Sequence, residues 1–230
     1  MSKVRGAYFS SALFEFFSDL EANNDKAWFE ANRQRYERDV KAPVLAFIAE
    51  IGPDLAKVSP RFVADPRPNG GSMFRIHRDV RFSKDKTPYK THAAVHFRHD
   101  AGKDVHAPGF YLHLAPAEVF LGAGIWRPEP KTLGAIRDAI VAKPADYERA
   151  SGEIAKKGWA LAGESLTRVP RGYDPSHPAA EALKRKDHTA LKQLSLGEAQ
   201  TADFRGDVVQ AYRAALPFNG FLAAALGLQV

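Results

Sequence analysis

The sequence predicts an α+β fold, in which an antiparallel β-meander at about residues 61–126 packs against N-terminal and C-terminal helices. Apolar residues recur with the period of helices over 10–57 and again over 130–230, and with the two-residue period of strands between them. Helices, then strands, then helices are typical of one sheet with helices packed on it. Because no clear linker separates the three parts, we expect a single domain over 1–230.

Three helices are expected in the N-terminal part. Four apolar side chains fall on one face of the first: Leu13, Phe16, Phe17 and Leu20. Asn24 is expected to cap the second helix, and Pro43 is suited to the first turn of the third. Gly52-Pro53 is expected to break or kink that third helix.

The predicted strands carry one apolar and one polar face. In residues 91–99 three apolar side chains alternate with His92, His96 and Arg98, and in 110–114 Tyr111 and His113 take the corresponding polar positions. A third strand is expected to end at Trp126. Short connections favour antiparallel pairing. If helices cover the polar face only in part, it forms a groove of titratable groups.

The C-terminal part is expected to be mostly helical. A helix begins near Pro144, and Ser195 with Glu198 has the spacing of a capping box. A last long helix follows the apolar positions from Phe204 to Ala215, and Pro217 is expected to interrupt it.

Composition narrows the class of protein. Of 230 residues, 45% are apolar and 26% charged, which is ordinary for a globular chain. The chain has no cysteine, so disulfides, cysteine nucleophiles and thiolate metal sites are excluded. There is no signal-peptide pattern and no apolar run of the roughly 20 residues that cross a bilayer. A soluble cytoplasmic protein with no membrane partner is therefore expected.

Positive charge is concentrated in one place. Between Arg67 and Arg98 there are eight basic and two acidic residues, so this window alone carries the net charge of +6 of the whole chain. Guanidinium groups bind phosphate or carboxylate through two hydrogen bonds, and crowded cations favour a bound anion. The predicted ligand-binding residues are Arg75, Arg78, Asp79, Arg81, Asp85, Lys86, Tyr89 and Lys90.

Apolar residues between these charges should anchor the segment to the core; they are Phe74, Ile76, Val80 and Phe82. Thr87-Pro88 disfavours helix, so residues 83–89 are expected to form a loop. Asp79 and Asp85 are expected to orient the arginines. Asp79 is also a candidate partner for Arg33 on the second helix.

The string R-x-x-R-D-x-R-F-x-x-D-K-x-P-Y-K, from Arg75 to Lys90, resembles the signature of the family catalogued as DUF2461. The stretches "NNDKAWFEANRQRY" (23–36) and "GFYLHLAPAEVFLGAGIW" (109–126) are similar to the same family. The resemblance covers nearly the whole chain and implies a bacterial protein with a single-domain unit. It implies no activity and assigns no catalytic residue.

Six of the eight histidines lie between 77 and 113, which raises the question of a metal: His77, His92, His96, His99, His106 and His113. His92 and His96 would lie roughly 13 Å apart on a strand and cannot hold one ion alone. No H-E-x-x-H pattern, Walker A string or dinucleotide fingerprint is present, so no metal and no cofactor are expected. The catalytic residues stay unknown, and the candidates for proton transfer are Tyr89, His96 and His113.

Three interpretations of the basic segment remain. It could bind a small phosphorylated or carboxylated anion, with or without catalysis. It could be an ion-pair network between sheet and helices. It could bind nucleic acid, with Phe82, Tyr89 or Trp126 as stacking surfaces, although the charge is confined to one block and no RRM, KH or helix-turn-helix signature is present. The burial and pairing of the arginines distinguish these interpretations, and the sequence predicts no oligomeric state.

Overall fold

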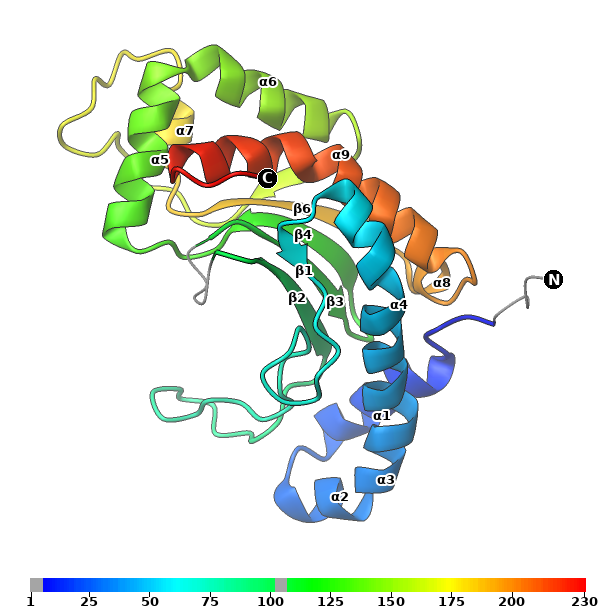
Figure 1. The fold of residues 1–230 in the computed structure, drawn as a ribbon. Coiled ribbons are helices and arrows are strands. Elements are labelled where there is room, and N and C mark those ends of the chain that lie inside the picture. The colour runs from blue at the N-terminus through cyan, green and yellow to red at the C-terminus, as the bar shows by residue number, and fades with distance from the viewer. Residues whose placement is uncertain (1–5, 102–106) are drawn as a thin grey trace.

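The protein was analysed as a computed structural model, which describes residues 6–101 and 107–230. Within these residues, six antiparallel strands form one sheet in the order β1-β2-β3-β4-β6-β5, with helices packed on it (Figure 1). The strands are β1 (Phe62–Val63), β2 (Ala93–His99), β3 (Gly109–Leu114), β4 (Val119–Ile125), β5 (Ala160–Ala162) and β6 (His188–Leu194). The predicted α+β fold with an antiparallel meander is confirmed.

The sheet extends beyond the predicted region. Strand β6 pairs with β4 over Val119↔Leu194 to Ile125↔His188, and β5 pairs with the outer edge of β6. Both strands lie in the part of the chain that we expected to be helical. The β6 sequence HTALKQL is poor in β-branched and aromatic residues, so pairing with β4 decides its conformation rather than its own propensity.

The N-terminal helices are α1 (Ser11–Ala22), α2 (Lys26–Ala31), α3 (Arg33–Tyr36), a π-helical turn η1 (Glu37–Lys41) and α4 (Ala42–Val58). The predicted apolar face of α1 is buried in the core. Asp25, and not Asn24, caps α2, because the Asp25 carboxylate accepts a hydrogen bond from the Trp28 N–H at 2.9 Å. Asn24 instead bonds a distant segment, as described below.

The C-terminal helices are α5 (Pro130–Ala142), α6 (Pro144–Ala155), α7 (Ala180–Lys184), α8 (Leu196–Ala199) and α9 (Phe204–Ala225). The predicted capping box begins α8: the Ser195 hydroxyl accepts the Glu198 N–H at 3.1 Å, and the Glu198 carboxylate accepts the Ser195 N–H at 2.7 Å. None of the helices within the described ranges has the length and hydrophobicity that crossing a bilayer requires.

Two prolines lie inside helices that continue past them. Helix α4 runs through Pro53, so a break there is wrong, and α9 runs through Pro217, so the predicted interruption is wrong. An interior proline costs about 3 kcal/mol. Apolar residues follow each proline and are fully buried, including Leu55 in α4 and Leu222 in α9. Burying one such side chain contributes about 1.5–3 kcal/mol, so several of them outweigh the proline.

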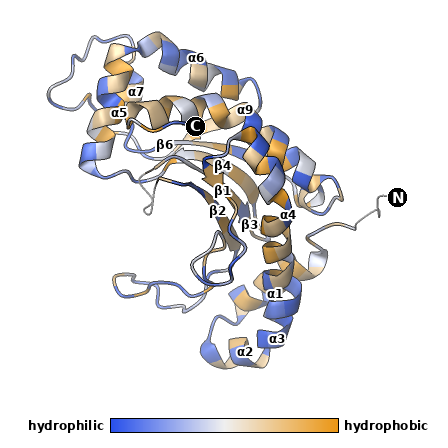
Figure 2. Ribbon diagram, viewed as in Figure 1, coloured by the Kyte–Doolittle hydropathy of each residue, from blue (hydrophilic) through white to orange (hydrophobic). Residues whose placement is uncertain are grey.

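The two faces of the sheet differ. One packs against α4 and α9, where the Tyr212 ring of α9 stacks on Phe110 at 4.4 Å between ring centres. The strands are largely hydrophobic, whereas the outer helices alternate between hydrophobic and hydrophilic residues (Figure 2). On the other side of the sheet, away from α4 and α9, runs the segment between β1 and β2 (Figure 1). That segment contains the basic residues.

Candidate functional site

Residues 76–90 form an irregular hairpin, here called the basic hairpin. The Lys90 N–H donates to the Ile76 carbonyl at 2.8 Å, and the Arg78 N–H donates to the Pro88 carbonyl at 2.9 Å. His77 and Tyr89 pair as an isolated antiparallel bridge between them. Just before the hairpin, the Phe74 N–H donates to the carbonyl of Ala94 in β2. The segment is thereby tied to strand β2.

The hairpin rests on helix α2. The buried Tyr89 ring stacks on Phe29 with 4.2 Å between ring centres. Asn24 Nδ2 donates to the Tyr89 carbonyl at 3.0 Å, and Asn24 Oδ1 accepts the Tyr89 N–H at 3.1 Å. Ile76 is buried as predicted, but Phe82 is 95% exposed at the hairpin tip, so its predicted anchoring role is wrong.

The two aspartates form local ion pairs near the tip. Asp79 pairs with Arg81 at 2.7 Å, and Asp85 pairs with Arg78. The hydrogen bond from Arg81 lowers the pKa of Asp79 to about 2, and the Thr87 N–H followed by Arg78 lowers the pKa of Asp85 to about 2. Arg33 pairs with Glu30 at 2.6 Å, so the proposed Arg33–Asp79 pair is wrong.

These pairs are not a buried network. The Arg81 side chain is 76% exposed, and exposed pairs of this kind contribute about 0–1 kcal/mol. Two aspartates face six basic side chains between residues 75 and 90. The side chains of Arg75 and Lys84 make no hydrogen bond or ion pair with any residue that the structure describes, and the Lys86 ammonium bonds only the Val80 carbonyl there.

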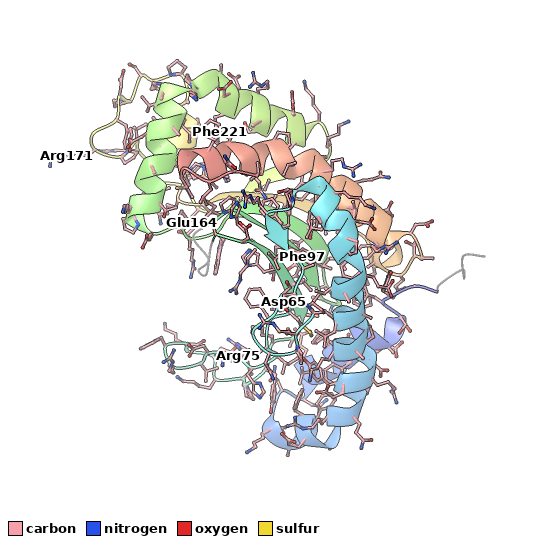
Figure 3. All side chains as sticks on the ribbon, viewed as in Figure 1. Asp65, Arg75, Phe97, Glu164, Arg171 and Phe221 are labelled. Carbon is pink, nitrogen blue, oxygen red and sulfur yellow. The ribbon has the colours of Figure 1, made fainter. Side chains whose placement is uncertain are left out.

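Two backbone carbonyls hold the Lys90 side chain in place. Its half-buried ammonium donates to the carbonyls of Arg75 at 2.5 Å and of His77 at 3.1 Å. An ammonium has three N–H donors, and no acceptor for the third lies among the described residues. Burial lowers the pKa of Lys90, and the positive charges of Arg75 and Arg78 lower it further. Arg75, Arg78 and Lys90 are called the cationic cluster below; Figure 3 shows Arg75 in its segment.

The neighbouring sheet face holds His96 in a defined orientation. The Arg98 Nε–H points to His96 Nδ1 at 3.3 Å. Because arginine only donates, neutral His96 carries its proton on Nε2. The ring lies over Gly109, since a Cβ at that position would come within 2.3 Å of His96 Nε2. Burial lowers the pKa of His96 to about 4, so His96 is neutral near pH 7.

A second histidine, His113, is held between two rings. Its ring stacks on Phe120 at 4.6 Å and meets the His92 ring, tilted by 30°, at 4.3 Å between centres. The Tyr111 hydroxyl lies 3.3 Å from His113 Nδ1, and Glu118 lies 3.7 Å from His113 Nε2. Burial lowers the pKa of both His92 and His113 to about 4 and raises that of Tyr111 to about 12.

Phe74 joins these groups to the cationic cluster. Its ring lies nearly parallel to His96 at 6.2 Å and meets Tyr111 at 6.3 Å. Lys90 Nζ and the Arg98 guanidinium carbon each lie 6.0 Å from the ring centre. Six rings therefore form one contiguous surface, here called the ring face: Phe74, His92, His96, Tyr111, His113 and Phe120.

The predicted site residues are thus divided between two places. Arg75, Arg78 and Lys90 gather beside the ring face, together with the candidates His96 and His113. Asp79, Arg81, Asp85 and Lys86 lie at the exposed hairpin tip, and Tyr89 lies in the core. Burial and the nearby Glu30 carboxylate raise the pKa of Tyr89.

Sequence analysis did not identify Phe74, Tyr111 or Phe120 as a joined surface. The alternation in β2 and β3 indicated the Tyr111 face, but the position of Phe74 depends on its pairing with β2. Among the described residues, no three histidines, aspartates or glutamates lie close enough to hold a metal ion. His106 lies outside the described residues.

Comparison with known proteins gave one informative result. A family model described as a conserved hypothetical protein matches residues 12–221, which include the basic hairpin and every strand. No match was found among curated proteins.

Proposed function

The chain belongs to the DUF2461 family, whose description names no activity, and we propose from its geometry that it binds a small phosphorylated or carboxylated anion. The cationic cluster carries this proposal. Arg75, Arg78 and Lys90 lie close enough together for the two arginines to lower the pKa of Lys90. Asp85 pairs with Arg78, and Asp79 lies near enough to Arg75 for that guanidinium to help lower the pKa of Asp79, so two carboxylates face the three cations.

Electrostatic repulsion within the cationic cluster favours the binding of an anion there. Two like charges about 6 Å apart repel each other by roughly 3 kcal/mol at an effective dielectric constant of about 20. The hairpin nevertheless holds these cations together, because Lys90 is tied to two carbonyls and Tyr89 is fixed on α2. An anion beside Lys90 would relieve the repulsion and accept the remaining N–H in a charge-assisted hydrogen bond.

The site also has groups suited to acid–base catalysis. His96 presents Nε2 over Gly109, and His113 is oriented between His92 and Phe120. A bound anion would raise the low pKa values of these histidines toward neutrality, because it favours their charged form. A reaction at this site would therefore use His96 or His113 for proton transfer. The buried ring of Tyr89 favours a supporting role for that residue.

The test compares two arginines of the same segment. Isothermal titration with inorganic phosphate, pyrophosphate and citrate should show binding to the wild-type protein. Arg75→Ala should weaken it about tenfold, as expected for a lost charged hydrogen bond. Arg81→Ala removes the same charge from the exposed tip and should change affinity less than twofold. No binding of any of these anions, or equal losses in the two variants, would contradict the proposal.

A second candidate function is single-stranded nucleic-acid binding. Two exposed aromatic residues favour it: Phe82 is 95% exposed beside Arg81, and Trp126 is 60% exposed with Arg127 over its ring at 4.6 Å. Bases stack on such rings with about 1–3 kcal/mol each. A labelled single-stranded probe should then bind with a steep salt dependence and weaken on Phe82→Ala. Absence of binding at low salt would eliminate this candidate.

A further inference from the structure

We infer that the anion bound at the cationic cluster carries a planar aromatic ring, as a nucleotide does, and that this ring stacks on the ring face. The inference rests on the proposed anion site and names the class of its ligand. It follows from the arrangement of rings, glycines and cations on one face of the sheet.

The first observation is the continuity of the ring face. His96 pairs with Tyr111 across β2 and β3, and Tyr111 pairs with Gly122 of β4, so their side chains project on the same side. Tyr111 lies 6.3 Å from Phe74 and 5.8 Å from Phe120 between ring centres. An aromatic surface therefore extends from the edge of the sheet to its central strands.

The second observation is the glycine floor beneath the rings. Gly109 and Gly122 face the same side as Tyr111, and neither places a side chain beside the rings. A Cβ on Gly109 would meet His96 Nε2 at 2.3 Å, and one on Gly122 would meet the Tyr111 Cβ at 3.2 Å. The glycines therefore let these two rings lie close to the strands, with Phe74 nearly parallel to His96 and at 61° to Tyr111. A planar ligand would stack on one of these rings and meet the edge of another.

The third observation is exposure. On the helix-covered face, Phe97, Phe110 and Tyr212 are fully buried. On the ring face, Phe74, Tyr111 and Phe120 are only half-buried, as are His92 and His96. Rings that only served the core would be covered like those of the opposite face. These partly exposed rings retain surface on which a base can stack.

The fourth observation is the distance between charge and ring. Lys90 Nζ lies 6.0 Å from the centre of the Phe74 ring, and the Arg98 guanidinium lies 6.0 Å from the same centre. A phosphate held by Lys90 therefore sits about one ring width from the stacking surface. The Tyr111 hydroxyl, which bonds His113 Nδ1, can also bond the polar edge of a base. Together these groups match a phosphate joined to a heteroaromatic ring.

The test separates the ring from the phosphate. AMP, ribose 5-phosphate and adenosine are titrated into the full-length protein by calorimetry. We expect AMP to bind at least tenfold more tightly than ribose 5-phosphate. Phe74→Leu should remove most of that difference and weaken ribose 5-phosphate much less than AMP. Phe82→Leu, the matched change at the exposed tip, should leave both affinities unchanged.

The outcomes separate this inference from the proposal on which it rests. Equal binding of AMP and ribose 5-phosphate would overturn the inference and leave the anion site standing. Failure of both to bind, together with inorganic phosphate, would remove the anion site itself. A 5′-phosphorylated oligonucleotide that binds more tightly than AMP and depends on Phe74 would support the inference and identify a strand end as the ligand.

A second measurement covers the case in which Phe74→Leu does not fold. In the wild-type protein with bound AMP, nuclear Overhauser effects should connect the adenine protons to the ring protons of Phe74 and Tyr111. Bound AMP that shows no such effects to either ring would overturn the inference.

Discussion

Charged side chains serve two different purposes at two regions of this sheet. Where β4, β5 and β6 end, the buried Asp187 carboxylate accepts the backbone N–H groups of Arg127 at 2.7 Å and of Glu164 at 2.9 Å. Nearby, buried Arg137 donates to the carbonyls of Leu183 at 2.8 Å and Arg185 at 3.0 Å. We call this region the Asp187 cluster. Its charged side chains form hydrogen bonds with backbone groups of the same chain and so stabilise the fold.

The backbone around Asp187 is shaped for this purpose. Gly163 has a φ of 96°, in the left-handed region, and a Cβ there would come within 2.4 Å of the Asp187 Cβ. Only a glycine brings the backbone this close without strain. The Asp187 cluster is therefore a structural use of charge, in which both carboxylate oxygens are satisfied.

The cationic cluster differs in each of these respects. Its side chains are exposed or half-buried. The Arg75 guanidinium has no hydrogen-bond partner in the described part of the chain, and one N–H of the Lys90 ammonium has no acceptor there. The same residue types therefore stabilise the fold in one region and retain hydrogen-bonding capacity for a ligand in the other. The two cases differ in whether the polar groups of the charged side chains already have hydrogen-bond partners.

Lowering the pH should reduce the free energy of unfolding through buried histidines in both regions. The pKa values of His92, His96 and His113 are lowered to about 4 and that of His188 to about 3, in each case mainly by burial. These histidines stabilise the fold fully above pH 6.5, and this contribution is lost as the pH falls from 6.5 toward 4. Between pH 7 and pH 5 each should cost roughly 1–2 kcal/mol in the free energy of unfolding, measured with urea.

Sulfate distinguishes the ring-face histidines from His188. Its charge does not change between pH 5 and pH 7, so a change in its effect reports on the protein. Sulfate should restore part of the stability at pH 5, since it binds beside the protonated ring-face histidines of the folded protein. It should bind more tightly at pH 5 than at pH 7. His188 lies on the opposite face of the sheet, so its share of the loss should remain. An unfolding free energy independent of pH over this range would contradict the assignment of these histidines as neutral.

Removing the Asp187 carboxylate should disrupt the structural region alone. Asp187→Ala leaves two backbone N–H groups unsatisfied, which costs about 2–5 kcal/mol in total. The melting temperature should fall by roughly 5–15 °C. Asp187→Asn keeps one acceptor and should lose less. Phosphate affinity below the melting temperature should equal that of the wild-type protein, and a parallel loss would show that the two regions are not separate.

Lys90→Met should affect both stability and binding. The substitution removes the two hydrogen bonds to the carbonyls of Arg75 and His77, which should cost about 1–2 kcal/mol in the free energy of unfolding. It should also weaken phosphate binding more than tenfold. If Lys90→Met is less stable but binds phosphate with the affinity of the wild-type protein, Lys90 serves only to stabilise the fold.

The smallest effect is expected at the hairpin tip. Arg81→Ala removes an exposed pair with Asp79 and should change the free energy of unfolding by less than about 0.5 kcal/mol. Urea unfolding at low and high salt measures this directly. A larger loss would mean that the tip is part of the structural network that the sequence left as an alternative.

The sequence identified the fold class because periodicity reports which side chains are buried. It did not identify β6, because the conformation of HTALKQL depends on pairing with β4, about 70 residues away. The functions of Asn24 and Asp187 were also missed. Both bind backbone groups of remote residues, and no side-chain pattern records such partners.

The candidate site was predicted only in part, for a similar reason. Phe74 and Phe82 both flank arginines in one segment, and their sequence surroundings do not distinguish them. The bond from Phe74 N–H to Ala94 directs one ring over the sheet, and the absence of a strand partner leaves the other exposed at the tip. Charge density identified the segment, and tertiary pairing decides which of its cations face the sheet.

The central claim is that an anion binds between the cationic cluster and the ring face. Histidine side-chain nitrogens, followed by NMR during a titration with pyrophosphate at pH 7, test it most directly. The account predicts that the resonances of His92, His96 and His113 shift together while that of His188, on the opposite face, stays in place. Saturating pyrophosphate that moves none of the first three, or moves His188 equally, would contradict it.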